Sequence, residues 1–491
     1  MITFTLALVA LVAGYFFYSK YVASVFEPDA SRLTPALAHA DGVDYIVMPG
    51  WKVFMIQFLN IAGTGPIFGA IMGAKFGPVA YLWIIFGCIF AGAVHDYLSG
   101  MLSLRNDGVG LPELIGKYLG RRTMRIMLVF SLLLLIMVGA VFVYSPAIIL
   151  SGMFSGVAGS INLWFIVIFV YYVLATMLPI DKIIGKIYPL FAVSLLFMAV
   201  ALLVCLYVKM PQLPELWDGL GNLGAATDSS FTEMIFPGLF ITIACGAISG
   251  FHATQSPLMA RCIRKETFGR PIFYGAMITE GIVALIWATV AMYFFYASLE
   301  AGYNVVAGAQ DGFHTSAPSV VKLICNDWLG VAGGILALLG VVAAPITSGD
   351  TAFRSARLIV ADALKISQRP ISKRLMVSIP LFLVAIALLL WQIDNPDGFN
   401  VIWQYFGWAN QSLSVFTLWM LTVYLTLEHK PYIITLIPAL FMTAVCTTFI
   451  FVSPQALGLS PAIGYSLGGL CTLIAIVWFC WWKRGLVAEL K

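Results

Sequence analysis

The stretch Ala244-Cys245-Gly246-Ala247-Ile248-Ser249-Gly250 interrupts a long apolar segment of this chain, and Ala62-Gly63-Thr64-Gly65-Pro66 interrupts an earlier one. Glycine is conformationally permissive and proline lacks an N–H donor, so each stretch predicts a break in a helix. In lipid, unpaired backbone groups cost several kcal/mol, and breaks therefore persist where they line a cavity or hold a ligand. The alternative is that Gly65, Gly69 and Gly73 form a face of small residues for helix packing.

The composition around these stretches is that of a protein immersed in lipid. Of 491 residues, 61% are hydrophobic and 10% are charged, whereas a soluble domain has about 25% charged residues. The net charge of +4 is expected from basic cytoplasmic loops and does not indicate nucleic acid. The apolar N-terminal stretch has no preceding Lys or Arg and no convincing cleavage site, so we expect a retained helix.

The cysteines show no CxxC pair and fall mostly in apolar segments, which favours packing over a disulfide framework or a zinc site. A bond between Cys205 and Cys325 is left open.

Apolar stretches of roughly 20 residues, the length that crosses a membrane, predict an all-α polytopic membrane protein with about 13 transmembrane helices. The predicted spans are Ile2–Tyr18, Val53–Gly73, Val79–Leu104, Met124–Leu150, Ile161–Met177, Ile187–Val208, Met234–His252, Ile272–Tyr296, Trp328–Ile346, Met376–Leu390, Ile402–Leu425, Ile433–Val452 and Ala462–Trp482.

The distribution of basic residues predicts the orientation of these spans. With the N-terminus outside and the C-terminus inside, 24 of the 27 Lys and Arg lie in cytoplasmic segments, and the exceptions are Lys75, Lys209 and Lys322. The reversed orientation would contradict the positive-inside rule.

The two breaks lie in the second and seventh predicted helices, which are five helices apart. An odd number of crossings inverts the second five-helix unit relative to the first, as in many secondary transporters. We therefore predict a LeuT-like 5+5 inverted repeat, although no sequence similarity between the halves is visible. The predicted units are an N-terminal peripheral segment, two repeats and two C-terminal peripheral helices, with bounds 1–51, 52–230, 231–428 and 429–491.

The substrate cavity is expected between the two breaks, because half-helix termini suit charged ligands. Amide and imidazole side chains that are unsuited to lipid are expected to face the same interior, where hydrogen bonding between helices is their commonest role. The candidate substrate-binding residues are Gly63, Thr64, Gly65, Cys245, Gly246, Ser249, His252, Asn410 and Gln411.

Glu280 is the first candidate for proton coupling. It lies nine residues beyond Pro271, which places it about 13 Å deep in a core about 30 Å thick. A carboxyl there can take up a proton. The alternative is a hydrogen-bonded tether between helices.

His95 and Asp96 lie near mid-depth in the third predicted helix, nine to ten residues before Arg105. They predict a proton relay, or alternatively a salt bridge from Asp96 to a cytoplasmic Arg with His95 as a packing residue. No HxxxH or HExxH pattern is present, so the sequence predicts no metal site and no cofactor.

The run Pro345-Ile346-Thr347-Ser348-Gly349-Asp350 offers a possible cation site, because Thr347, Ser348 and Asp350 supply the oxygen ligands that a hard cation needs. The alternative is a helix C-cap that leads into a cytoplasmic segment, residues 351–364, whose Arg354 and Arg357 meet lipid headgroups.

Several blocks resemble the carbon starvation protein A family. They are the stretch from Phe240 to His252, Ile61-Ala62-Gly63-Thr64-Gly65-Pro66, Ala91-Gly92-Ala93-Val94-His95-Asp96, Tyr274-Gly275-Ala276-Met277 with Glu280, and Ala409-Asn410-Gln411. The resemblance runs from about Pro49 to Lys430. It implies a bacterial inner-membrane transporter, linked to peptide uptake and pyruvate import by proton symport, in the amino acid-polyamine-organocation superfamily. Many members are longer and have Gln at the position of His95.

We therefore expect a secondary active transporter, and not an enzyme, that imports a peptide or pyruvate-like carboxylate by proton symport. Its partners would be the small-molecule substrate, a coupling proton or sodium ion, and membrane lipid, with no nucleic acid; the sequence does not decide the oligomeric state. The alternatives are a sodium-coupled symporter, a channel or nutrient sensor, and an intramembrane enzyme built from His95, Asp96, His252 and Cys245. The sequence offers no recognised nucleophile motif for the last of these.

Overall fold

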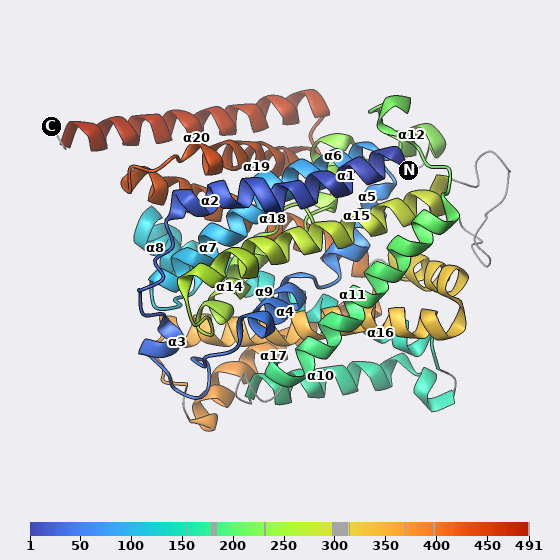
Figure 1. Ribbon diagram of the computed structural model, residues 1–491, viewed down its shortest axis with the longest axis horizontal. Coiled ribbons are helices and arrows are strands. Elements are labelled where there is room, and N and C mark those ends of the chain that lie inside the picture. Colours follow the sequence, from blue (N-terminus) through green and yellow to red (C-terminus); the bar gives the residue numbers. More distant parts are fainter. Residues whose placement is uncertain are drawn as a thin grey trace.

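The computed structural model describes residues 1–154, 156–177, 184–229, 232–296, 313, 315–368, 370–395 and 398–489. In these ranges the regular structure is helical, and no strand occurs. The long helices run side by side along the long axis of one bundle, and the N- and C-termini lie toward opposite ends of that axis (Figure 1).

Helices and short 3₁₀ or π segments, labelled η, follow one another along the whole described chain. In order they are α1 Ile2–Ala13, η1 Gly14–Tyr18, α2 Ser19–Phe26, α3 Pro35–Ala38, α4 Gly50–Ile61, η2 Gly65–Gly69, α5 Ala70–Ala74, α6 Val79–Phe86, η3 Gly87–Gly92, α7 Ala93–Arg105, α8 Leu111–Leu119, α9 Arg121–Ser151, η4 Gly156–Gly159, α10 Ile161–Met177, α11 Ile184–Lys209, η5 Leu216–Asp218, α12 Leu223–Thr227, η6 Ile235–Leu239, α13 Phe240–Thr242, α14 Gly250–Ala260, η7 Glu266–Phe268, η8 Arg270–Tyr274, α15 Gly275–Tyr296, α16 Ala317–Ala363, α17 Ile371–Asp394, α18 Gly398–Leu427, α19 Ile433–Val452 and α20 Pro461–Glu489.

Eight helices in the described ranges are long and apolar enough to cross a membrane, or nine if the bent pair α4 and η2–α5 is one span. The chain is thus a multi-pass membrane protein. The other predicted spans fall on α10, an apolar helix of 17 residues, on α13–α14, which flank the second break, and on α16 and α18. The count of 13 spans and the LeuT-like repeat stay predictions.

Both predicted breaks are confirmed. The first separates α4 from η2 and bends the helix pair by 54°. The second separates α13 from α14, and within it Gly246 has a φ of +93°, a left-handed conformation that favours glycine. Two long apolar segments are therefore interrupted inside the bundle.

The two breaks pack directly on each other. A Cβ atom placed on Gly65 would overlap Cys245, and one placed on Gly246 would overlap Ala284 of α15. These glycines are needed because other side chains occupy the space that their own would fill. The second break is thus enclosed by the first break and by α15.

The prediction that the run Pro345–Asp350 ends a helix is wrong. Helix α16 kinks at Gly330, where φ is +65°, but continues through Pro345 to Ala363. The expected contact of Arg354 and Arg357 with lipid headgroups is also wrong, because both side chains are fully buried.

Asp44, in the segment between α3 and α4, is the partner that these arginines share. Its Oδ1 lies 3.3 Å from Arg354 Nη1 and 3.4 Å from Arg357 Nη2. Burial opposes the charge of Asp44, but Arg357, Arg354 and Arg261 outweigh it and hold the pKa of that carboxyl below its usual value. The segment before the first broken helix is thus anchored to α16.

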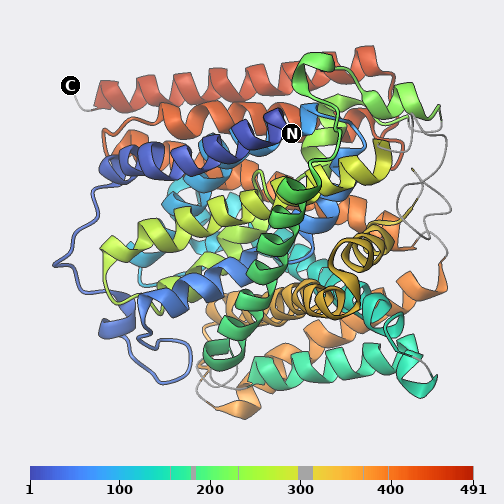
Figure 2. The same cartoon turned by 45° about the vertical axis from the view of Figure 1, so that its right-hand side comes forward.

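Large apolar side chains are exposed at the edges of the bundle. In two views α20 and α10 lie at opposite edges (Figures 1 and 2), and α20 exposes large apolar side chains such as Trp478 and Trp481. The eight cysteines are free thiols, so the bond left open between Cys205 and Cys325 is absent.

Candidate functional site

The second break is held open by an amide from another helix. Asn410 of α18 accepts hydrogen bonds at its Oδ1 from the Phe251 backbone N–H, at 2.7 Å, and from Ser249 Oγ, at 3.0 Å. The first N–H groups of a helix have no partner within it, so Asn410 acts as a cap for α14 from outside its own segment. The structure brings Asn410 and Ser249 together as part of one site.

Two further predicted residues join this cap. Asn410 Nδ2 lies 3.8 Å from Cys245 Sγ, and the thiol lies 3.6 Å from Ser249 Oγ. The neighbouring Gln411 donates through Nε2 to the Phe240 carbonyl at 2.9 Å. Helix α18 thereby contacts the chain on both sides of the second break.

Four ionisable side chains from α7, α14 and α15 form one buried chain. His95 Nδ1 lies 2.7 Å from Asp96 Oδ1, and His252 Nδ1 lies 2.8 Å from the other oxygen, Oδ2. On the far side of the imidazole, His252 Nε2 lies 3.4 Å from Glu280 Oε2. All four side chains have no exposed surface. This row of side chains connects three helices.

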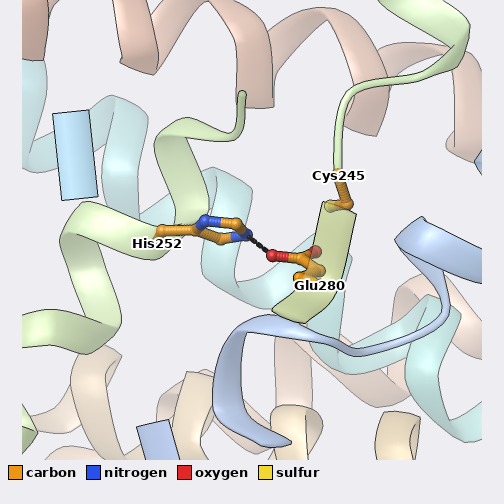
Figure 3. Close-up of side chains that lie close together, drawn as sticks. All are labelled: Cys245, His252 and Glu280. Atoms are coloured by element: carbon orange, nitrogen blue, oxygen red, sulfur yellow. Dashed lines mark ion pairs between the residues drawn. The ribbon is translucent and has the colours of Figure 1, made fainter. Parts of the chain in front are cut away.

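The alternative predicted for Asp96, a salt bridge to a cytoplasmic Arg, is wrong. Its partners are the two imidazoles, while Arg105 pairs with Glu266 at 3.1 Å. A carboxylate accepts hydrogen bonds, so both imidazoles present an Nδ1–H to Asp96. His252 Nε2 is therefore turned toward Glu280, as Figure 3 shows.

Cys245 lies beside His252 and Glu280. Its Sγ, His252 Nε2 and a Glu280 oxygen all lie within 4.8 Å of one another, a set of donors that can hold a metal ion. In Figure 3 the thiol approaches Glu280 from the non-helical segment. Motif searching missed this group because its members lie 7 and 28 positions apart on a break and on two helices.

The first break contributes polar groups that lie close to the same region. Thr64 Oγ1 is buried and has no hydrogen-bond partner among the described residues, and the same holds for both side-chain heteroatoms of Asn60. A Cβ on Gly63 would overlap Phe142 and lie 3.2 Å from Ser348 Oγ. Sequence reasoning missed Asn60, which lies in the last turn of α4, two residues before the break.

The three predicted cation ligands point to different partners. Ser348 donates to the Leu59 carbonyl of α4 at 3.0 Å, and Thr347 donates back to Ala344 of its own helix at 2.8 Å. Asp350 Oδ2 accepts from the Tyr188 hydroxyl at 2.6 Å. Of the three, Ser348 is the one that reaches the first broken helix.

A cavity of about 320 Å³ lies against parts of both interrupted segments that flank the breaks. Ile241 and Thr242, just before the second break, line it together with Met72, which follows the first break. Trp403 and Gln404 of α18 complete one wall. The cavity therefore adjoins both interrupted helices.

Comparison with known proteins identifies relatives over nearly the whole chain. A family described as "Carbon starvation protein CstA" matches residues 1–160, 147–327 and 320–449. An "Uncharacterized membrane protein" of Haemophilus influenzae is 45% identical over 339 residues, which cover 60% of this chain and 91% of that protein.

Named relatives are transporters. The "Peptide transporter CstA" of Campylobacter jejuni is 29% identical, with coverage of 87% of this chain and 76% of the relative. The "Pyruvate/proton symporter BtsT" of Escherichia coli is 28% identical, with coverage of 56% and 46%.

Among solved structures, a manganese transporter of Eremococcus coleocola has a TM-score of 0.56 at 12% identity, covering 92% of this chain and 99% of that one. This similarity concerns the fold. Because the family match covers most of the sequence, the chain belongs to the carbon starvation protein CstA family.

Proposed function

We propose that this protein is a secondary active transporter that imports a small carboxylate-bearing nutrient, either a short peptide or a pyruvate-like acid, across a bacterial inner membrane by proton symport. The observation that carries the proposal is the packing of two broken helices on each other, where Gly65 leaves space for Cys245. Breaks of this kind are where transporters bind substrates.

Unpaired polar groups at the first break suit a carboxylate. Asn60 and Thr64 bring an amide and a hydroxyl, neither of which has a partner among the described residues. Next to them lies the start of the η2–α5 half-helix at Gly65. The N-terminus of a helix carries partial positive charge and attracts anions.

The cavity against the two interrupted segments is the proposed entrance. It contacts Met72 on one broken helix and Thr242 on the other, so a solute there lies next to both. Under this proposal the units 52–230 and 231–428 are inverted repeats that move against each other, with the N-terminus outside and the C-terminus inside.

The proton is proposed as the coupling ion because one relative is a pyruvate/proton symporter by name. The assignment of Glu280, Asp96 and His95 to this step stays a prediction. Sodium is the second candidate, and the contact between Ser348 and the Leu59 carbonyl supports it. Leu59 lies near the carbonyl end of α4, where negative partial charge favours a cation.

Uptake into proteoliposomes tests the proposal. Labelled pyruvate and a labelled short peptide are supplied while a proton gradient or a sodium gradient is imposed separately. We expect accumulation of one solute under the proton gradient. Accumulation driven by the sodium gradient alone would show that sodium, and not the proton, is the coupling ion. If neither gradient drives uptake of either solute, the assignment to these solutes is overturned.

A further inference from the structure

We propose that Cys245, His252 and Glu280 bind one divalent transition-metal ion of the zinc class through Sγ, Nε2 and a carboxylate oxygen. The three side chains come from the second break, from α14 and from α15. A thiol, an imidazole and a carboxylate are the donor types that zinc takes in proteins.

The spacing of the donors fits such an ion. Zinc–ligand distances of about 2.0–2.3 Å in a tetrahedral arrangement place the donor atoms roughly 3.3–3.7 Å apart. His252 Nε2 and Glu280 Oε2 are already 3.4 Å apart. Since all three donors lie within 4.8 Å of one another, bringing the thiol to such a separation needs a shift of about 1.5 Å or less.

Asp96 prepares His252 to coordinate a metal. Its Oδ2 lies 2.8 Å from His252 Nδ1, and a carboxylate on one ring nitrogen fixes the tautomer that leaves the other nitrogen free for metal. His95 in turn holds the second oxygen of Asp96 at 2.7 Å. The outer contacts of a metal-binding histidine are therefore present.

Burying these ligand atoms is energetically unfavourable unless a cation or a proton is bound between them. Neither Glu280 oxygen has a hydrogen-bond partner among the described residues, nor does His252 Nε2, and both side chains have no exposed surface. A simple hydrogen bond between them would be 2.7–3.2 Å long, shorter than the 3.4 Å observed.

An ion bound here would join the second break to α15 and, through Asp96, to α7. The ligands of this ion include Glu280, the first candidate for proton coupling, so a bound ion would occupy that carboxylate. We therefore assign it as an inhibitor that locks the break rather than as cargo. This consequence for transport rests on the proposed function, whereas the binding itself does not.

Binding is tested on the purified full-length chain by titration with Co²⁺ and competition with Zn²⁺. A thiolate ligand gives bound Co²⁺ a charge-transfer absorption band. We expect one ion per chain, displaced by Zn²⁺. Cys245→Ser should remove the band, whereas Cys446→Ser, at a buried thiol on α19, should keep it. A band that persists unchanged in Cys245→Ser, or the absence of a one-to-one complex, overturns the proposal.

Asp96→Asn is a second variant that keeps all three ligands. Loss of the carboxylate behind His252 should weaken the affinity roughly 10–100-fold, and unchanged affinity would contradict the assigned role of Asp96. Glu280→Gln replaces Cys245→Ser if that variant does not elute as a monodisperse peak.

Because these titrations use neither solute nor gradient, their failure would leave the import proposal intact. Conversely, a chain that binds the ion but transports neither solute would fail the import proposal alone. Zn²⁺ should slow uptake by the wild type.

Discussion

Asn410 of α18 accepts the Phe251 backbone N–H at 2.7 Å, so a side chain about 160 positions away caps the first turn of α14. The same amide holds Ser249 and approaches Cys245. The shape of the second break therefore depends on α18.

Asn410→Ala should destabilise the protein by about 1–3 kcal/mol, because it leaves the buried N–H of Phe251 without a partner. Thermal unfolding in detergent, followed by tryptophan fluorescence, measures the change. Asn395→Ala is the matched control, since Asn395 is exposed and donates to the Trp391 carbonyl one turn earlier. Equal melting temperatures for the two variants would remove the capping role.

Gly65→Ala should destabilise the contact between the breaks by about 1–3 kcal/mol, the usual cost of overpacking. The added methyl group would overlap Cys245. Gly469→Ala on α20 is the control, because a Cβ there meets nothing within 4 Å. The double variant Gly65→Ala, Cys245→Gly should recover part of the loss, and no recovery would show that the contact is not the cause.

Acid should weaken the anchor formed by Asp44. Burial opposes its charge, but Arg357, Arg354 and Arg261 hold its pKa below the usual 3.8, so the stabilisation is complete above that value and is lost as the pH falls below it. Unfolding temperatures recorded from pH 6 down to pH 3 should fall more steeply for the wild type than for Asp44→Asn. Parallel profiles would contradict this account.

At neutral pH, Asp44→Asn should cost about 3–5 kcal/mol, because it leaves two buried guanidinium groups without their shared carboxylate. Asp327→Asn, at an exposed carboxylate, is the control. A loss of stability equal to that of the control would show that the contacts of Asp44 with the two arginines contribute little.

Ser348→Ala distinguishes the two candidate coupling ions. If sodium is coordinated near the Leu59 carbonyl, the variant should lose sodium-driven uptake at least about tenfold, a cost of roughly 1.4 kcal/mol. If the proton is the coupling ion, proton-driven uptake should continue. Thr351→Ala, whose hydroxyl bonds within α16, controls for the loss of a buried hydroxyl.

Local sequence signals predicted the breaks well. Gly63, Gly65 and Pro66 mark the first one, because the conformational preferences of these residues act within a few positions. Burial of Glu280, His95 and Asp96 agrees with their predicted positions inside long helices, and the depth of Glu280 in the membrane stays a prediction.

Contacts between distant segments could not be predicted in this way. Neither helical periodicity nor residue spacing shows that His252 bridges Asp96 and Glu280, because the bridge depends on how α7, α14 and α15 are rotated against one another. The continuation of α16 past Pro345 has a similar cause. Burial of Arg354 and Arg357 against Asp44, about 310 positions earlier, supports the helix beyond the proline.

Helix α4, the first half of the first broken helix, is connected to α16 at two points. Asp44, six residues before α4 begins, pairs with Arg354 and Arg357, and the Leu59 carbonyl in its last turn accepts from Ser348. Because both contacts join α4 and the residues just before it to the same helix, α4 should move together with α16 as one rigid body. Any rotation between the two halves of the broken helix must then be absorbed by the hinge at residues 62–64.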